Sequence, residues 1–415
     1  MIDPALAGPL PLLGVILVLG ACLGDAAERI RIPWITGCIV AGIILGPAAV
    51  NVLQGPELAG LDGFAQASLA VIAFNIGCQL TVGRLKSIGR SVVWLAAAQL
   101  LTPLILVFGA ERLTGLPLQT ALIVAAVAPA TAPTTTFSVI RRRQASRPFI
   151  DRALGVLAIN DAASVLTFSV VSAAAVALAG AAASGAIIRD SLSAAARNEL
   201  LSALVGVAIG VAYLAVRRLI EDGRPGWEAR LTALLIGLLL LGIGGAIAFG
   251  LSHLLVPLSI GLVVANGADE AERQRVQRLI QALEEPLFII FFVLAGAHLP
   301  LSLTQHLVLG LAAVVYLLAR FAGKYVAVFV TASALRLDAP TRRYLGLCFP
   351  SQGALAMGLV LALNGSPAVR ELPPTAAGSV EEAVSIILIG VLLSQILGPV
   401  LIDFAVRRGS EATRA

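Results

Sequence analysis

The stretch Val127-Ala128-Pro129-Ala130-Thr131-Ala132-Pro133-Thr134-Thr135-Thr136 decides the fold, because it puts two prolines and four threonines inside an apolar segment. Each proline lacks a backbone donor and clashes with the preceding helical turn, so a helix is interrupted here. The stretch Cys348-Phe349-Pro350-Ser351-Gln352-Gly353 interrupts a second apolar segment. Polar residues gather at both interruptions, which favours a paired site over the alternative of two independent proline kinks.

The surrounding sequence is that of a membrane protein. Hydrophobic residues make up 58% of the chain, charged residues make up 13%, and the mean hydropathy is +0.95. Soluble domains have about 45–50% apolar and about 25% charged residues, and a membrane-spanning helix needs about 20 apolar residues. We therefore predict an all-α polytopic membrane protein with thirteen transmembrane helices. They are expected near residues 9–27, 33–50, 64–82, 91–110, 117–140, 153–178, 199–216, 231–248, 252–267, 286–300, 306–332, 344–364 and 383–405.

The positive charges alternate between the loops that join these segments. Of the 29 Lys and Arg residues, 23 fall in one set of alternate loops and 4 in the other set. Cytoplasmic loops carry the excess of positive charge, so this pattern predicts an external N-terminus and a cytoplasmic C-terminus. The net charge of +5 lies in short loops beside the membrane, which argues for contact with lipid and against nucleic-acid binding.

The two interrupted segments predict an inverted repeat. They are the fifth and the twelfth in order, so their helices run in opposite directions through the membrane. Transporters with inverted repeats bind their substrate between such broken helices near the midplane. We expect the repeats to cover residues 1–178 and 230–405, with residues 199–216 as a linking span. The whole chain, 1–415, is expected to form one transmembrane domain without a cytosolic regulatory domain, and 179–198 a surface loop or short interfacial helix.

Asp161 is the carboxylate near the middle of a predicted span, directly after the first interruption. Charged residues at membrane depth are costly and usually mark an ion or proton pathway. A carboxylate there can hold a proton or a cation, but not both at once, which is the minimal requirement for exchange. Hard cations prefer oxygen ligands, so we expect Na+ at Asp161. The further candidate ligands are Asn160, Thr131, Thr134 and Ser164.

Arg320 and Lys324 are the two basic residues expected inside the membrane, and four residues apart they share a helix face. Lys324 is the candidate counter-charge: it can pair with Asp161 in the empty state and release it when a cation binds, and it can also cap carbonyl groups at the broken helices, where the helix dipole is negative. The sequence leaves open which of Arg320 and Lys324 faces the site. A purely structural salt bridge to Asp161 is the alternative. Structural roles are expected for Arg320, Pro129, Pro133, Pro350 and Gln352.

The four cysteines lie inside predicted spans without the spacing of a zinc site. A zinc site is therefore not expected. We also expect no cofactor and no enzymatic activity; Na+ and H+ are expected only as the transported ions.

Together, these motifs resemble the cation/proton antiporter superfamily, and within it the bacterial sodium/proton and Kef-like members. The matching segments follow one another in the family's order and cover nearly the whole chain. They are Ile32–Gly37, Ala41–Pro47, Ala128–Pro133, Ala158–Asp161, Phe291–Gly296, Arg320–Lys324 and Pro350–Gly353.

The resemblance implies a homodimer in the bacterial cell membrane, with a dimerisation domain and a mobile core domain. It implies that Asp161 carries the ion and the proton in an elevator-like motion. The pair Asn160-Asp161 resembles the electroneutral branch of the superfamily, where electrogenic members have Asp-Asp. Electrogenic members have a lysine in the eleventh span where the electroneutral branch often has an arginine. This chain offers both, Arg320 and Lys324, so the resemblance leaves the stoichiometry open.

The sequence thus predicts a secondary-active antiporter that exchanges a monovalent cation (Na+, with Li+ or K+ as alternatives) for H+ and contributes to pH homeostasis. A sodium-coupled symporter of an organic anion is the second candidate, although its usual need for more than one sodium site fits a single acid less well. A membrane sensor that binds without transporting is the third candidate.

Overall fold

A computed structural model of the chain contains helices as its only regular elements among the described residues. By length and composition, eight of these helices are able to cross a membrane, and three further apolar helices are shorter. Each segment predicted to span the membrane contains a helix, which confirms the all-α fold, while the count of thirteen crossings stays a prediction. The structure describes residues 9–30, 33–47, 49–53, 55–83, 89–132, 136, 139, 147–180, 185–220, 226–298, 306–364, 369 and 372–414.

The chain divides into two compact units, each built from two separate parts of the sequence. Unit 1 combines Met1–Val82 with Ala196–Leu301, and unit 2 combines Gly83–Ala195 with Ser302–Ala415. Each unit therefore takes helices from both predicted repeats. The symmetry of those repeats stays a prediction.

Unit 1 is held together by closely packed helices. Its elements are α1 (Pro9–Arg29), α2 (Trp34–Leu45), α3 (Gly55–Gln79), most of α9 (Gly185–Arg217), α10 (Trp227–Ala248), α11 (Leu255–Gly267) and α12 (Glu270–Ala297). Helix α2 packs between α1 and α12, and α3 packs on α11. A Cβ atom at Gly42 of α2 would lie 2.0 Å from the carbonyl oxygen of Val293 in α12, so only glycine permits this approach. Small residues at such crossings are typical of helices packed in membranes.

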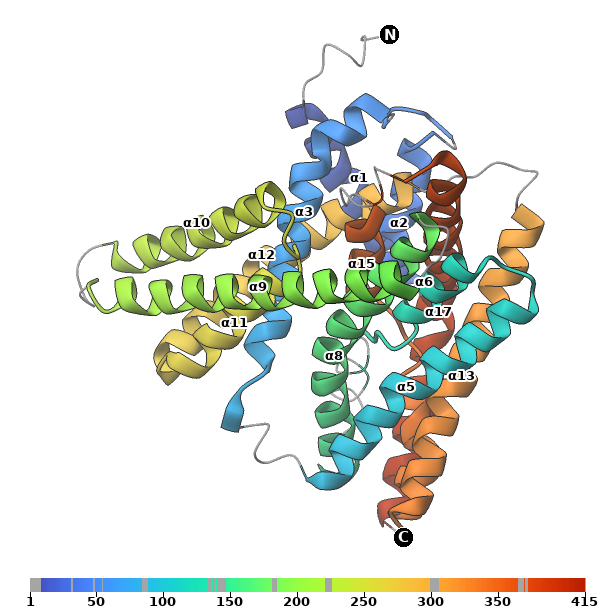
Figure 1. Ribbon diagram of the computed structural model, residues 1–415. Coiled ribbons are helices and arrows are strands. Elements are labelled where there is room, and N and C mark those ends of the chain that lie inside the picture. Colours follow the sequence, from blue (N-terminus) through green and yellow to red (C-terminus); the bar gives the residue numbers. More distant parts are fainter. Residues whose placement is uncertain are drawn as a thin grey trace. The chain divides into compact units, whose positions relative to one another are not determined.

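Unit 2 contains both interrupted segments. Its elements are α5 (Arg90–Leu113), α6 (Leu118–Val127), α8 (Arg147–Gly180), α13 (His306–Ala334), α14 (Ala339–Tyr344), the 3₁₀ helix η2 (Leu345–Cys348), α15 (Ala354–Asn364) and α17 (Pro374–Arg414). Helices α5 and α13 run side by side (Figure 1). Helix α6 packs on α5, α8 and α17, and this arrangement brings the first interruption next to α8.

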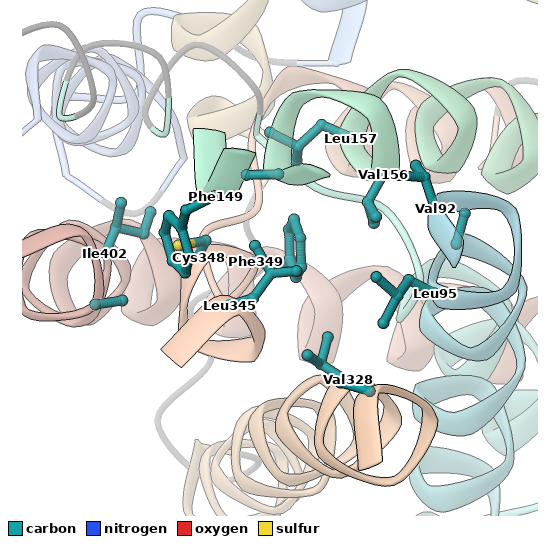
Figure 2. Packing of buried hydrophobic residues seen from close by; sticks show 14 of the residues in the cluster. Val92, Leu95, Phe149, Val156, Leu157, Val328, Leu345, Cys348, Phe349 and Ile402 are labelled. Atoms are coloured by element: carbon teal, nitrogen blue, oxygen red, sulfur yellow. The ribbon is translucent and has the colours of Figure 1, made fainter. Parts of the chain in front are cut away.

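The hydrophobic core of unit 2 surrounds the second interruption. Figure 2 shows Phe349, which follows η2, among Leu95 of α5, Val156 and Leu157 of α8, and Val328 of α13. All five side chains are almost completely buried. The short helix before the second interruption is therefore anchored by apolar packing from three long helices.

A polar contact fixes the start of α14. The carboxylate of Asp338 accepts a hydrogen bond from the backbone N–H of Thr341 at 3.1 Å and caps the helix. Arg152 of α8 donates to the same carboxylate and to the hydroxyl of Thr341. This contact ties α8 to the segment that leads into the second interruption.

Two helices differ from the sequence prediction. Helix α9 begins at Gly185, so a single long helix occupies most of 179–198, where a loop or a short separate helix was expected. Helix α12 begins at Glu270 rather than near residue 286, because Asp269 caps it by accepting from the N–H of Glu272 at 2.8 Å. In both cases a polar helical part precedes the apolar part that sequence reasoning detected.

Candidate cation site at the interrupted helices

The two interruptions meet in unit 2. Helix α6 ends at Val127, and residues 130–132 are not helical; the second interruption lies between Cys348 and Ala354. The backbone N–H of Ala132 donates to the carbonyl of Ser351 at 3.0 Å, and the hydroxyl of Thr136 donates to the carbonyl of Cys348 at 3.0 Å. The interruptions predicted from Pro129 and Pro350 are therefore present and in contact, whereas Pro133 and Thr134 lie outside the described residues.

Arg320 of α13 joins the two interruptions through their carbonyl groups. Its guanidinium donates to the carbonyl of Ala128 at 2.9 Å, to that of Ala130 at 2.6 Å, and to that of Pro350. The side chain is completely buried. Broken helices leave carbonyls without intrahelical partners, and the planar fork of arginine is suited to bind several acceptors at once. This arrangement supports the structural role predicted for Arg320.

Lys324 lies one turn further along α13 and donates to the carbonyl of Pro129. It is completely buried and interacts electrostatically with Asp161, but among the described residues the two form no direct ion pair. The amide of Gln99 in α5 donates to the backbone carbonyl of Lys324. Of the two roles considered for Lys324, the structure therefore has the capping of a carbonyl group and not a direct pair with Asp161.

Gln352 of the second interruption also binds the first interruption. Its side-chain amide donates to the carbonyl of Val127 at 3.1 Å, and its side-chain oxygen accepts from the hydroxyl of Tyr316 at 2.8 Å. Its backbone N–H donates to the hydroxyl of Ser394 in α17 at 3.2 Å. The structural role predicted for Gln352 therefore has three specific contacts in its support.

Helix α17 packs closely against the second interruption at Gly398. A Cβ atom at Gly398 would lie 2.8 Å from the Cα atom of Ser351, which leaves no room for a side chain. The hydroxyl of Ser351 donates to the side-chain oxygen of Gln395 at 3.1 Å. The position of the second interruption is thus fixed from α13 and from α17.

Asp161 of α8 faces the first interruption. Its carboxylate accepts a hydrogen bond from the hydroxyl of Thr131 at 2.8 Å, and only 3% of the residue is exposed. Ser164, three residues later, shares the helix face of Asp161. The side-chain amide of Asn160 donates to the carbonyl of Pro129 at 3.5 Å, and this contact joins α8 to the first interruption. The structure therefore brings Thr131, Asn160 and Asp161 together at one interruption, and Ser164 lies one turn further along the helix of Asp161.

Two oxygens at this site have no hydrogen-bond partner. They are the side-chain oxygen of Asn160 and the hydroxyl of Ser164, and both are buried. Buried polar atoms are normally paired, so unpaired oxygens beside a carboxylate suit an oxygen-seeking cation. With Asp161 and Thr131, they offer the type of donor set that hard cations prefer.

Sequence reasoning missed the polar residues that support the site from neighbouring helices. Ser394 and Gln395 are adjacent polar residues within an apolar segment, and this pattern could have identified them as candidate site residues. Gln99 and Tyr316 are single polar residues in long apolar segments. Their partners are carbonyl and amide groups far away in the sequence, so they carry no comparable signal.

Comparison with known proteins identifies the family. The family model described as "Sodium/hydrogen exchanger, transmembrane" matches residues 14–408. The protein named "Putative cation/proton antiporter YbaL" of Escherichia coli (strain K12) is 26% identical over 406 residues, which are 93% of this chain and 66% of that protein. The chain thus spans slightly less than two thirds of the length of this relative.

Solved structures share the fold. The sodium proton antiporter MjNhaP1 of Methanocaldococcus jannaschii, in a structure at pH 8, has a TM-score of 0.74 at 19% identity, and the match covers 96% of this chain and 97% of that chain. An electron-microscopy structure of the same antiporter has a TM-score of 0.66 at 20% identity, with 95% of each chain covered. Because the family model matches nearly the whole sequence, the chain belongs to the sodium/hydrogen exchanger family of cation/proton antiporters.

Proposed function

We propose that this protein is a secondary-active antiporter in which Asp161 alone carries a monovalent cation, Na+ in the first place, in exchange for H+. The observation that carries the proposal is the position of Asp161. It is the one carboxylate hydrogen-bonded to either interruption among the described residues. Asn160, its neighbour in the sequence, and Ser164, which shares its helix face, have buried oxygens without a hydrogen-bond partner. A cation and a proton compete for this carboxylate, so binding one releases the other.

The basic residues have a separate role in this proposal. Arg320 and Lys324 occupy carbonyl groups that the interruptions leave free. These carbonyls would otherwise attract the cation away from the carboxylate. The positive charge also balances Asp161 in the empty state without a direct ion pair, so that cation binding does not have to break one. Breaking a buried pair is costly.

Alternating access is proposed as a movement of unit 2, which contains both interruptions and Asp161. Its helices are tied to one another by the polar contacts of Arg320 and Gln352. A unit held in this way can move with its site intact. We further propose a homodimer in the bacterial cell membrane, with the N-terminus outside and the C-terminus in the cytoplasm, as the loop charges predict.

Proton flux in proteoliposomes tests the proposal. A gradient of Na+, Li+ or K+ should drive proton movement with the native protein and none with Asp161→Asn. Asp151→Asn is the matched control, because Asp151 is exposed on the same helix, and it should retain full exchange. Exchange retained in folded Asp161→Asn would refute the carrier assignment. If no cation drives proton movement in the native protein, flux of an organic anion with sodium should be measured next, because it distinguishes a symporter from a sensor.

A further inference from the structure

A second buried carboxylate lies in unit 2 away from the interruptions. Glu111 is in the last turn of α5, its side chain is completely buried, and neither carboxylate oxygen has a hydrogen-bond partner. Carboxylates are rarely left buried without a partner. When ionised, both oxygens only accept. The hydroxyl of Thr114 donates to the backbone carbonyl of Glu111 at 2.7 Å, so the two carboxylate oxygens are available to a cation.

A second acidic residue stands next to Glu111. Glu382 of α17 is partly exposed and is near enough to interact with Glu111 electrostatically. The hydroxyl of Thr120, in the first turn of α6, lies 3.2 Å from a carboxylate oxygen of Glu382 and 3.2 Å from the carbonyl of Ser379. Two carboxylates that interact in this way repel each other when both are charged, and a cation or a proton at this position relieves the repulsion.

We propose that Glu111 and Glu382 bind a second monovalent cation, beside Thr120 and the carbonyl of Ser379. These four residues offer oxygen ligands only, which suits a hard cation. Glu382 reaches the surface of unit 2 and Glu111 is enclosed, so a cation enters past Glu382 and is held by Glu111. The inference rests on the proposed function for the class of cation, Na+ or a related ion.

The second site adjoins the interrupted helices through one side chain. Tyr316 interacts electrostatically with Glu111, and its hydroxyl donates to Gln352 of the second interruption at 2.8 Å. A cation at Glu111 therefore changes the charge next to a residue that binds the interruption. Cation binding at this second site would therefore respond to the cation concentration on one side of the membrane independently of cation binding at Asp161.

The test is the thermal stability of the purified full-length protein in NaCl, compared with N-methylglucamine chloride at the same ionic strength and pH. A bound cation stabilises the folded protein. Four forms are needed: native, Asp161→Asn, Glu111→Gln, and the double variant. Glutamine keeps the size of Glu111 and supplies a donor, so this variant is expected to fold. The matched control is Glu381→Gln, because Glu381 is the exposed neighbour of Glu382 in the sequence.

We expect Asp161→Asn to keep part of the Na+-dependent rise in melting temperature, and the double variant to lose it. The Glu381→Gln control should behave like the native protein. Equal responses of Asp161→Asn and the double variant would overturn the second site. If both responses are absent or smaller than the native response, the function of Asp161 is left untouched. A response that disappears with Glu111→Gln but persists fully with Asp161→Asn would support the second site and overturn the Asp161 assignment. Glu382→Gln in the Asp161→Asn background repeats the test if Glu111→Gln does not fold.

Discussion

Replacing Arg320 with lysine separates the charge of this side chain from its geometry. The guanidinium serves three carbonyls, those of Ala128, Ala130 and Pro350. A lysine keeps the positive charge, but its single ammonium group can reach one of these carbonyls from the same Cα position. Two buried acceptors are then left without donors, at about 1–3 kcal/mol each. The expected loss is therefore about 2–6 kcal/mol of folding stability in unit 2.

The melting temperature of the purified protein measures this loss. A change of 1 kcal/mol shifts the melting temperature by about 2–4 °C in domains of 150–250 residues, so Arg320→Lys should melt at least about 4 °C lower. Arg343→Lys is the matched control, because the same exchange is made at an exposed position of unit 2, where substitutions change stability by about 0.5 kcal/mol or less. If the two variants melted at the same temperature, the three-carbonyl clamp would not stabilise the interruptions and the reasoning would be refuted.

Two further predictions concern the supports of the second interruption. Asp338→Ala removes the cap of α14 and should cost about 1 kcal/mol. Partial burial opposes the effect, but hydrogen bonds, first of all from Thr341, hold the pKa of Asp338 below its ordinary value of 3.8. The contribution of Asp338 to stability is therefore complete above pH 3.8 and is lost as the pH falls through the lower pKa of the folded protein. The melting temperatures of the native protein and the variant should therefore converge in acid. A difference that stays constant with pH would contradict this. Gly398→Ala should lower stability by about 1–3 kcal/mol, because its Cβ would lie 2.8 Å from Ser351. Gly378→Ala on the same helix is the control, since open space surrounds this position and stability should not change. Equal melting temperatures of the two variants would exclude the close approach of α17 to Ser351.

The fold could be predicted from the sequence where local chemistry determines it. Pro129 and Pro350 lack a backbone donor and stand among polar residues, and helices are interrupted at both, whereas Pro103, Pro286 and Pro399 lie inside continuous helices. The long apolar segments can only be helices in a membrane. The polar first half of α12 was missed, because Glu270 and its neighbours interrupt the apolar pattern although Asp269 caps the helix. A search for apolar segments detects the part of a helix inside the membrane and not the part that extends beyond it.

The candidate site could be predicted only in part. Asp161 is conspicuous as a carboxylate at membrane depth, and Thr131, although 30 residues earlier, stands in the interruption that precedes the span of Asp161. The carbonyls that Arg320 and Lys324 bind depend on how α13 packs against both interruptions, and no spacing in the sequence encodes that. For the same reason, the sequence left open whether Lys324 pairs with Asp161 or caps a carbonyl, and the structure has the second arrangement.

The central claim is that a cation and a proton compete for one carboxylate, and the dependence of the apparent KM for Na+ on pH tests it most directly. Initial rates of exchange would be measured in proteoliposomes over a range of Na+ concentrations at several pH values. Where the proton occupies Asp161, the KM is expected to rise as the pH falls, approaching about tenfold per pH unit. A KM that stays constant across the whole pH range, while the maximal rate changes, would show that cation and proton bind at different groups and would contradict the account.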